Sequence, residues 1–150
     1  METLVIYESI HHRNTEKVVE EVAEVLGCKT VRPSNLEKEE IDRYSTLILA
    51  SGIYFGKMHR SIRQLLDRIE GKDIFIIVTS GFRNLPVLNP FRKNIEKRVE
   101  ENNRLEGLFS CRGFDTYGIL EKFGGFYRNH PDTKDLERAR EFAETVKTQG

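Results

Sequence analysis

The sequence has no excess of charge of either sign, few cysteines and no long apolar run, and each absence excludes a class of function. Lysine plus arginine and aspartate plus glutamate both number 24 in the 150 residues, so the net charge is zero. Nucleic-acid binding uses an excess of positive charge, and we therefore expect no nucleic-acid partner. The apolar run near the amino terminus, residues 3–7, is too short for a membrane span or a signal peptide, which predicts a cytoplasmic location.

Several common catalytic and metal-binding motifs are also missing. The two cysteines, Cys28 and Cys111, lie far apart with no CxxC or Cys/His spacing, so no metal site and no redox dithiol is predicted. The turn after the first predicted strand has neither the GxGxxG of dinucleotide-binding folds nor the GxxxxGK[ST] of nucleoside triphosphatases. None of the four histidines has an obvious nucleophile partner, and so no catalytic residue is assigned.

What the sequence does contain is an alternation of apolar strands and amphipathic helices. Its 150 residues suffice for one domain with its own core, and we expect a single domain over residues 1–150. Four predicted strands are apolar runs typical of burial on both faces, and a fifth, residues 29–32, is polar and suits a sheet edge. The predicted strands are residues 3–7, 29–32, 46–50, 74–79 and 108–111.

Apolar residues at helical spacing fill the segments between these strands. The alternation predicts an α/β, doubly wound protein with a parallel sheet and helices on both faces. Residues 33–45, with Pro33 and many charges, leave room for a short helix or none, and Asp132 is placed to cap the last helix. The predicted stripes are Val18, Val22, Val25 and Leu26; Met58, Ile62, Leu65, Leu66 and Ile69; Phe91, Ile95 and Val99; and Leu136, Ala139, Phe142, Ala143 and Val146.

In such a sheet, ligands bind beyond the carboxyl ends of the strands. Residues 9–15 follow the first strand and lead into a helix, whose amino end favours an anion such as a phosphate. The alternative is that Asn14 or Thr15 only caps the helix. His11, His12 and Arg13 either add positive charge for a phosphate or are simply solvated.

The turns after the third and fourth strands complete the predicted site. In residues 51–57 two glycines bracket an apolar, aromatic tripeptide, which indicates a flexible loop that lays a ring against a flat ligand. The alternative is that these aromatic residues pack into the core beneath the loop. Residues 79–84 form another small, glycine-containing turn with one aromatic residue.

These segments resemble the flavodoxin family. The family's opening strand, phosphate loop and helix are similar to TLVIYESIHHRNTEKVVEEVA. Its third strand and flavin loop are similar to STLILASGIYFGKMHRSIRQLLD, and its fourth strand with the following flavin loop is similar to IFIIVTSG. The phosphate loop reads SIHHRNT, one residue longer than the common form of the motif. The resemblance implies a flavodoxin-like three-layer sandwich with five parallel strands in the order 2-1-3-4-5, and FMN as the cofactor.

The resemblance also implies roles for individual residues. Ser9, Asn14 and Thr15 would contact the FMN phosphate, with His11 and Arg13 as neighbours. Ile53 or Tyr54 would pack on one face of the ring system, and Phe82 would be a second stacking partner. The residues expected along the ring are Ser51, Gly52, Ile53, Tyr54, Phe55 and Gly56, with Ser80, Gly81 and Phe82 at its pyrimidine side.

Three functions remain open on these grounds. The first is an electron carrier between a reductase and an acceptor protein, as a monomer or weak dimer. The second is an FMN-dependent NAD(P)H:quinone or flavin reductase, which the zero net charge and the long aromatic segment 113–130 favour. That segment would be a flavin lid, a partner surface, a dimer contact or only a cover for the sheet edge. A phosphorylation receiver, the third, needs an aspartate at the end of the third strand, where Ala50 and Ser51 stand.

Overall fold

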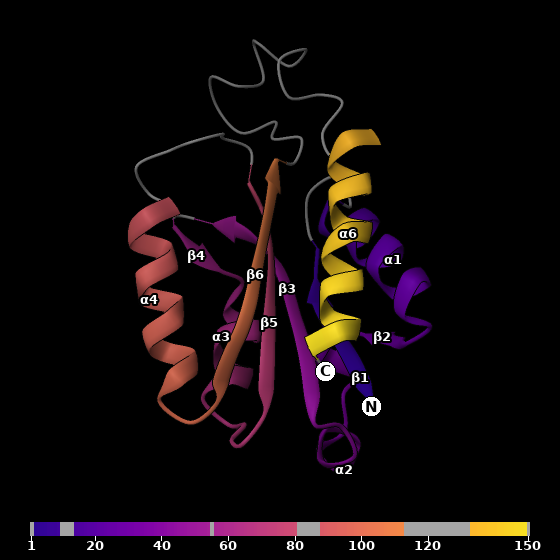
Figure 1. Cartoon of the computed structure of the whole chain (residues 1–150). Helices are drawn as coiled ribbons and strands as arrows, with labels where there is room; N and C mark the ends of the chain where they lie inside the picture. The colour runs from indigo at the N-terminus through magenta and orange to yellow at the C-terminus, as the bar shows by residue number, and fades with distance from the viewer. Residues whose placement is uncertain (1, 10–13, 55, 81–87, 113–132, 150) are drawn as a thin grey trace.

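Five parallel strands form the central layer of the computed structural model, which describes residues 2–9, 14–54, 56–80, 88–112 and 133–149 (Figure 1). They lie in the order β2-β1-β3-β5-β6, which is the predicted order 2-1-3-4-5 when the parallel strands are counted along the chain. The predicted fold class is therefore confirmed. The strands are β1 (Thr3–Glu8), β2 (Lys29–Val31), β3 (Thr46–Tyr54), β5 (Asp73–Ser80) and β6 (Arg104–Arg112).

Two strands, β3 and β6, extend several residues beyond their predicted bounds, and β1 and β5 extend by single residues at their ends. β3 runs to Tyr54 and then forms a hairpin with a two-residue strand, β4 (Lys57–Met58), that sequence analysis did not predict. The expectation of a flexible loop starting at Ser51 is thus wrong, because Ser51 and Gly52 pair with β5 before the hairpin begins. β6 begins at Arg104, well before its predicted start. A bulge inserts Glu106 between the residues that pair with Ile74 and Phe75, and it breaks the regular alternation of side chains in this part of the strand.

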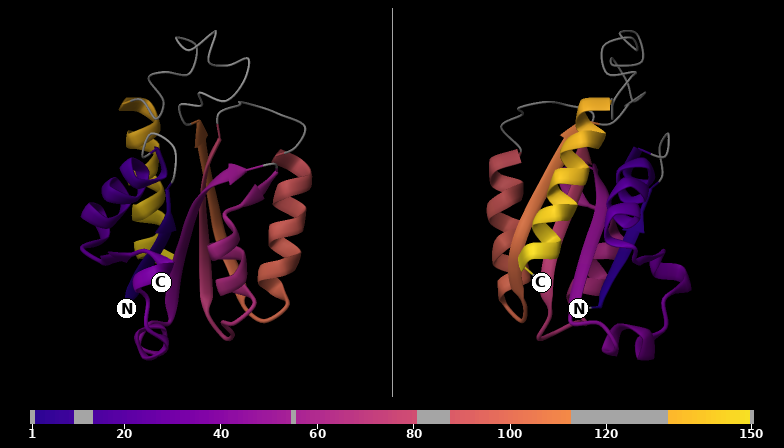
Figure 2. Two further views of the ribbon diagram at one scale, coloured as in Figure 1. Left: turned by 180° about the vertical axis from the view of Figure 1, so that it is seen from behind. Right: turned by 45° about the vertical axis from the view of Figure 1, so that its right-hand side comes forward.

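Helices cover both faces of the sheet (Figure 2). α1 (Asn14–Leu26) and α6 (Thr133–Gln149) lie on one face, and α3 (Arg60–Leu66) and α4 (Leu88–Glu100) on the other. Alternate strand residues feed two separate cores: Leu4 and Ile6 point toward α3 and α4, whereas Val5 points toward α1. All four predicted helical stripes contribute buried residues to these cores.

Three aromatic rings fill the core beneath α6. Phe142 meets Phe75 edge to face with ring centroids 5.9 Å apart, and it meets Phe109 at 5.5 Å. Gly107 makes room for them, because a Cβ atom there would lie 3.1 Å from Cδ1 of Phe75. These contacts pack α6 against β5 and β6.

The crossover between β2 and β3 contains only short helical turns, as predicted. They are η1 (Pro33–Asn35) and α2 (Lys38–Asp42). β2 lies at the sheet edge, which confirms the prediction from its polar sequence. Asp132, the predicted cap, lies outside the described residues. Among the helices of the described residues, none has the length and apolar character needed to span a membrane.

Candidate functional site

The carboxyl ends of β1, β3 and β5 lie side by side, toward the top of Figure 1. Glu8 of β1 pairs with Ser51 of β3, and Ser51 pairs in turn with Val78 of β5. One residue further on, Gly52 pairs with Thr79. The three strand ends that precede the predicted ligand turns therefore lie in one row.

A hydrogen bond between two buried threonines joins the start of α1 to the end of β5. The Oγ1 atoms of Thr15 and Thr79 are 2.8 Å apart, and either hydroxyl can be the donor. Thr15 is 2% exposed and Thr79 is 4% exposed. The bond connects two of the three turns to which sequence analysis assigned the ligand.

The hydroxyl group of Ser9 lies at the end of β1 with its hydrogen-bonding capacity unused. Its Oγ atom is buried and has no hydrogen-bond partner among the residues that the structure describes. A buried hydroxyl without a partner costs about 1–3 kcal/mol. An oxygen-rich group bound above the turn would accept its proton, which fits the predicted phosphate contact. Asn14, another predicted contact, is buried at the start of α1.

Ser51 has a structural position that sequence analysis missed. Its side chain is fully buried, accepts a hydrogen bond from the backbone N–H of His59 at 2.8 Å and donates one to the carbonyl of Gly52 at 2.6 Å. The hydroxyl thus fastens the end of β3 to the start of α3. Its hydrogen bonds are made within the protein.

The hairpin after Gly52 continues β3 beyond the row of strand ends. Ile53 pairs with Met58, and its half-buried side chain packs on the core beneath α3 and α4. Gly56 has a φ of 78°, a conformation that favours glycine, and a Cβ atom there would point into open space. Gly52 is buried in the sheet, so its backbone is what it can offer a ligand.

Several predicted site residues cannot be placed in this geometry. For Tyr54 and Ser80 the structure describes the strand backbone only. The residues outside the described ranges are His11, Arg13, Phe55, Gly81 and Phe82, together with the segment 113–130. Their predicted contacts stay predictions.

An ion pair beside the Ser9 turn was not predicted. The guanidinium of Arg32 lies 2.8 Å from the carboxylate of Glu8, with 33% and 18% of the two side chains exposed. The same guanidinium nitrogen is 3.5 Å from the carbonyl oxygen of Ser9. It also sits 5.0 Å from the centre of the Tyr7 ring. Arg32, which follows the edge strand β2, thereby contacts the end of β1 and Ser9, the first residue of the predicted phosphate segment.

The same carboxylate reaches α3 on the other side. Ser61 donates to Glu8 at 3.3 Å, and its hydroxyl lies 2.8 Å from Nδ1 of His59. The His59 ring also accepts from the backbone N–H of Ser61 and so caps α3. A continuous set of contacts therefore runs from Arg32 to the residue whose backbone binds Ser51. No spacing motif signals it, because Glu8 and Ser61 are 53 positions apart.

The phenol of Tyr7 links β1 to the first turn of α1. It donates to the carboxylate of Glu16 at 3.3 Å. Burial raises the pKa of the Tyr7 phenol above its ordinary value, and the negative charge of Glu16 raises it further. The phenol is therefore a neutral hydrogen-bond donor near neutral pH, and it helps to fix the helix whose amino end forms the candidate anion site.

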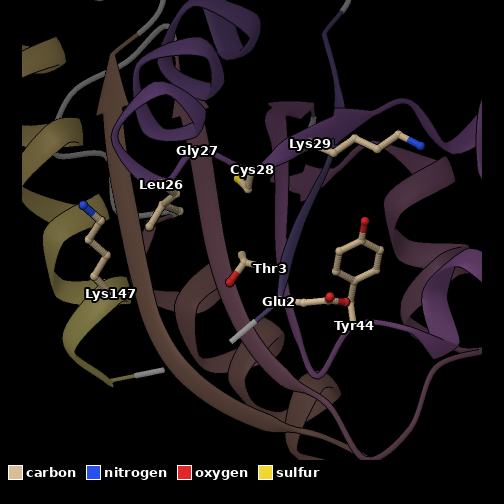
Figure 3. A pocket seen from close by; sticks show the side chains of 8 residues that line it. All are labelled: Glu2, Thr3, Leu26, Gly27, Cys28, Lys29, Tyr44 and Lys147. Carbon is tan, nitrogen blue, oxygen red and sulfur yellow. The ribbon is translucent and has the colours of Figure 1, made fainter.

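A pocket of about 450 Å³ lies at the opposite, amino edge of the sheet (Figure 3). Lys147 of α6 lines one side, and Tyr44 and Lys29 line the other. Its charges are of both signs, and the ammonium group of Lys29 is bound to the carboxylate of Glu40. Burial raises the pKa of the Cys28 thiol in its wall. The wall carries none of the residues that sequence analysis assigned to a ligand.

The fold is similar to that of solved flavodoxins. Over the full length of both chains it matches oxidised flavodoxin 2 from Bacillus cereus with a TM-score of 0.71 and 18% identity. A flavodoxin from the domain Archaea has a TM-score of 0.65 and 16% identity, covering 98% of this chain and 99% of that one. The Trp repressor binding protein from Bacillus subtilis has a TM-score of 0.69 and 17% identity, covering 93% and 96%. These likenesses define the fold as flavodoxin-like.

Sequence similarity narrows this class to a family. The family model for the flavodoxin domain matches residues 4–129. An uncharacterised protein from Methanocaldococcus jannaschii is 38% identical over 149 residues, which cover 97% of this chain and 98% of that protein. The chain belongs to the flavodoxin domain family, as the resemblance of its strand and loop segments had indicated.

Proposed function

We propose that this chain binds FMN at the carboxyl edge of its sheet and carries electrons between a reductase and an acceptor protein. The observation that carries the proposal is the buried hydrogen bond between Thr15 and Thr79, which ties the amino end of α1 to the end of β5. It draws two of the predicted ligand turns together. Membership of the flavodoxin domain family supports the same cofactor.

The phosphate group of FMN suits the amino end of α1. If Thr79 donates its hydroxyl proton to Thr15, the hydroxyl proton of Thr15 is left to donate toward the ligand. Ser9 supplies a second hydroxyl, which has no partner among the described residues. The unpaired backbone N–H groups and the dipole of this 13-residue helix add to the attraction for a dianion.

The hairpin formed by β3 and β4 suits the ring system. The backbone of Gly52 lies in the row of strand ends, and Gly56 lets the chain reverse at once without a side chain in the way. We propose that Ile53, Tyr54 and Phe55 line one side of the ring, and that Ser80, Gly81 and Phe82 line its pyrimidine edge. Ser51 supports this arrangement without contacting the ring, because its hydroxyl binds the carbonyl of Gly52 and the backbone N–H of His59 at the start of α3.

When bound, FMN supplies the one-electron chemistry, and the protein has to hold the ring, shield it from water and set its electrostatic surroundings. The hydroxyl and backbone groups at the strand ends position the cofactor. Arg32 and Glu8 hold Ser9 at the end of β1, and they place one charge of each sign next to it.

A second candidate is an FMN-dependent NAD(P)H:quinone or flavin reductase. It is favoured by the equal numbers of acidic and basic residues, which leave no strong net charge for steering. The aromatic-rich sequence of residues 113–130 is also long enough to shape a substrate pocket. Steady oxidation of NADPH with a quinone, without an added reductase, would favour this enzyme over the carrier.

The proposal is tested by titrating FMN into the purified, flavin-free chain and following the quenching of flavin fluorescence. We expect one FMN per chain. Thr15→Val removes a proposed phosphate contact and should weaken binding by about tenfold, equal to about 1.4 kcal/mol. Thr145→Val is the matched control, because that hydroxyl is exposed on α6 and bonds only within its helix. A chain that binds no FMN, or equal affinities for both variants, would contradict the proposal.

A further inference from the structure

The charges of this neutral chain are distributed unequally over its two helical layers. α3 and α4 together carry six lysines and arginines against two glutamates, whereas α1 carries four glutamates against one lysine. α6 has equal numbers of both signs. Among the described helices, α3 and α4 therefore carry a positive surplus, and α1 gives the other layer a negative surplus.

The positive charge is densest where this layer reaches the candidate site. β4, α3 and the first two turns of α4 contain no carboxylate. β4 leads directly into α3, and in Figure 1 β4 lies at the level of the upper, amino-terminal end of α4, toward the carboxyl edge of the sheet. We call the exposed cations of this region the basic corner; they are Lys57, Arg60, Arg92 and Lys93.

These four side chains have no ion-pair partner among the described residues, unlike other cations of the same helices. Arg98 binds both carboxylate oxygens of Asp67, at 2.9 and 2.8 Å, and Arg63 donates to the carbonyl of Met58. The positive charge of the basic corner thus faces solvent, whereas Arg98 joins α4 to the end of α3 and Arg63 joins α3 to β4.

We propose that the basic corner docks an acidic electron-transfer protein, so that the partner's redox group meets the proposed flavin beside the β3 and β4 hairpin. This inference rests on the proposed function and adds the chemistry of the partner. Lys57 lies on the hairpin itself, directly after Gly56. A partner attracted to the corner is therefore held next to the proposed flavin edge.

Long-range attraction makes such a corner effective although the net charge is zero. Opposite charges steer two proteins into the orientation that brings them together, and this raises the association rate at low salt. The negative surplus of α1 repels the same partner, so the wrong orientation is disfavoured. A nucleic acid fits less well, because a long polyanion needs several phosphate contacts along a continuous basic surface, and this chain has no excess of cations.

The probe is an acidic plant-type [2Fe–2S] ferredoxin, reduced beforehand, mixed with the FMN-loaded chain in a stopped-flow instrument. One electron leaves the reduced iron–sulfur cluster and enters the oxidised flavin, and the rate constant is measured from about 20 to 500 mM salt. We expect the rate constant to fall by about tenfold over this range. A rate constant that is constant or rises with salt would overturn the proposal.

Charge reversal locates the docking surface. Lys57→Glu with Lys93→Glu should slow the reaction by about tenfold at low salt and abolish most of its salt dependence. The matched control is Lys38→Glu with Arg43→Glu, because it changes the net charge equally but lies in and after α2, at the amino edge of the sheet. Equal slowing by the two double variants would show a net-charge effect and overturn the proposal.

A second measurement separates this inference from the proposed function. Binding of oxidised ferredoxin to the flavin-free chain is followed by isothermal titration calorimetry, and it should weaken several-fold in the basic-corner variant but not in the control. This readout holds even if the chain binds no FMN, a result that would contradict the proposed function alone. If the basic-corner variant binds ferredoxin as tightly as the wild type, the docking proposal alone is overturned. The same holds if the chain binds a single-stranded oligonucleotide more tightly than ferredoxin.

Discussion

Thr15 and Thr79, 64 positions apart in the sequence, share one buried hydrogen bond of 2.8 Å between their hydroxyl oxygens. The bond joins the first turn of α1 to the end of β5, at the edge of the sheet where the proposed ligand turns follow the strands. Both side chains are almost fully enclosed, so neither hydroxyl has water as a ready substitute.

The first prediction concerns the stability of this pair. Thr79→Val removes one hydroxyl and leaves that of Thr15 buried without this partner, and we expect the free energy of unfolding to fall by about 1–2 kcal/mol. Thr15→Val combined with Thr79→Val removes both polar groups and should recover a large part of the loss. Urea unfolding of the flavin-free chains measures both values. A double variant that loses the sum of the single effects would show that the hydroxyls are not coupled.

The second prediction distinguishes a structural role of Ser51 from a ligand contact. Ser51→Ala removes the buried hydroxyl that accepts from the partly buried backbone N–H of His59, and we expect the free energy of unfolding of the flavin-free chain to fall by about 1–2 kcal/mol. Ser110→Ala, at an exposed position in β6, should change stability by less than about 0.5 kcal/mol. If Ser51→Ala lowers FMN affinity but leaves the flavin-free stability unchanged, the hydroxyl contacts the ligand and the structural role is wrong.

Sequence alone predicted the sheet well because its strands are read from local apolar runs. Leu4, Val5 and Ile6 are all fully buried, and a strand covered on both faces has no polar position to obscure its pattern. The hairpin at the end of β3 was missed for the opposite reason. Ser51, Gly52 and Gly56 are residues typical of turns, and only pairing with other strands shows which of them lie in a strand.

The position of the candidate site could be predicted from local sequence, but the contacts within it could not. The turns that follow β1, β3 and β5 could be named, because the order of strands fixes the edge at which they meet. The contacts that hold them could not be predicted, since Arg32 reaches Glu8 across 24 positions and Thr15 reaches Thr79 across 64. Such contacts depend on side-chain directions in the finished fold and leave no spacing pattern in the chain.

The third prediction concerns the ion pair between Arg32 and Glu8. Arg32→Met leaves a mostly buried carboxylate without its cation, and we expect a loss of about 2 kcal/mol, part of which Glu8→Gln restores in the double variant. The pair Lys147 and Glu144 is the control, because it is 3.9 Å apart and far more exposed. Its coupling energy should be below about 0.5 kcal/mol. Equal couplings for the two pairs, measured by urea unfolding, would contradict the prediction.

The last prediction concerns the pH dependence of stability from Cys28. Burial raises the pKa of its thiol in the folded chain, so folding favours the neutral form. The thiol therefore leaves stability intact below the pKa of an unfolded cysteine, about 8.5, and lowers it as the pH rises through the higher pKa of the folded state. We expect wild type to lose more free energy of unfolding than Cys28→Ala between about pH 7.5 and pH 9.5.

In a Cys111→Ala background, iodoacetamide at about pH 8.5 should alkylate Cys28 several-fold more slowly in the folded chain than in urea. Parallel pH profiles for wild type and Cys28→Ala, together with equal alkylation rates, would show that the folded chain does not disfavour the thiolate.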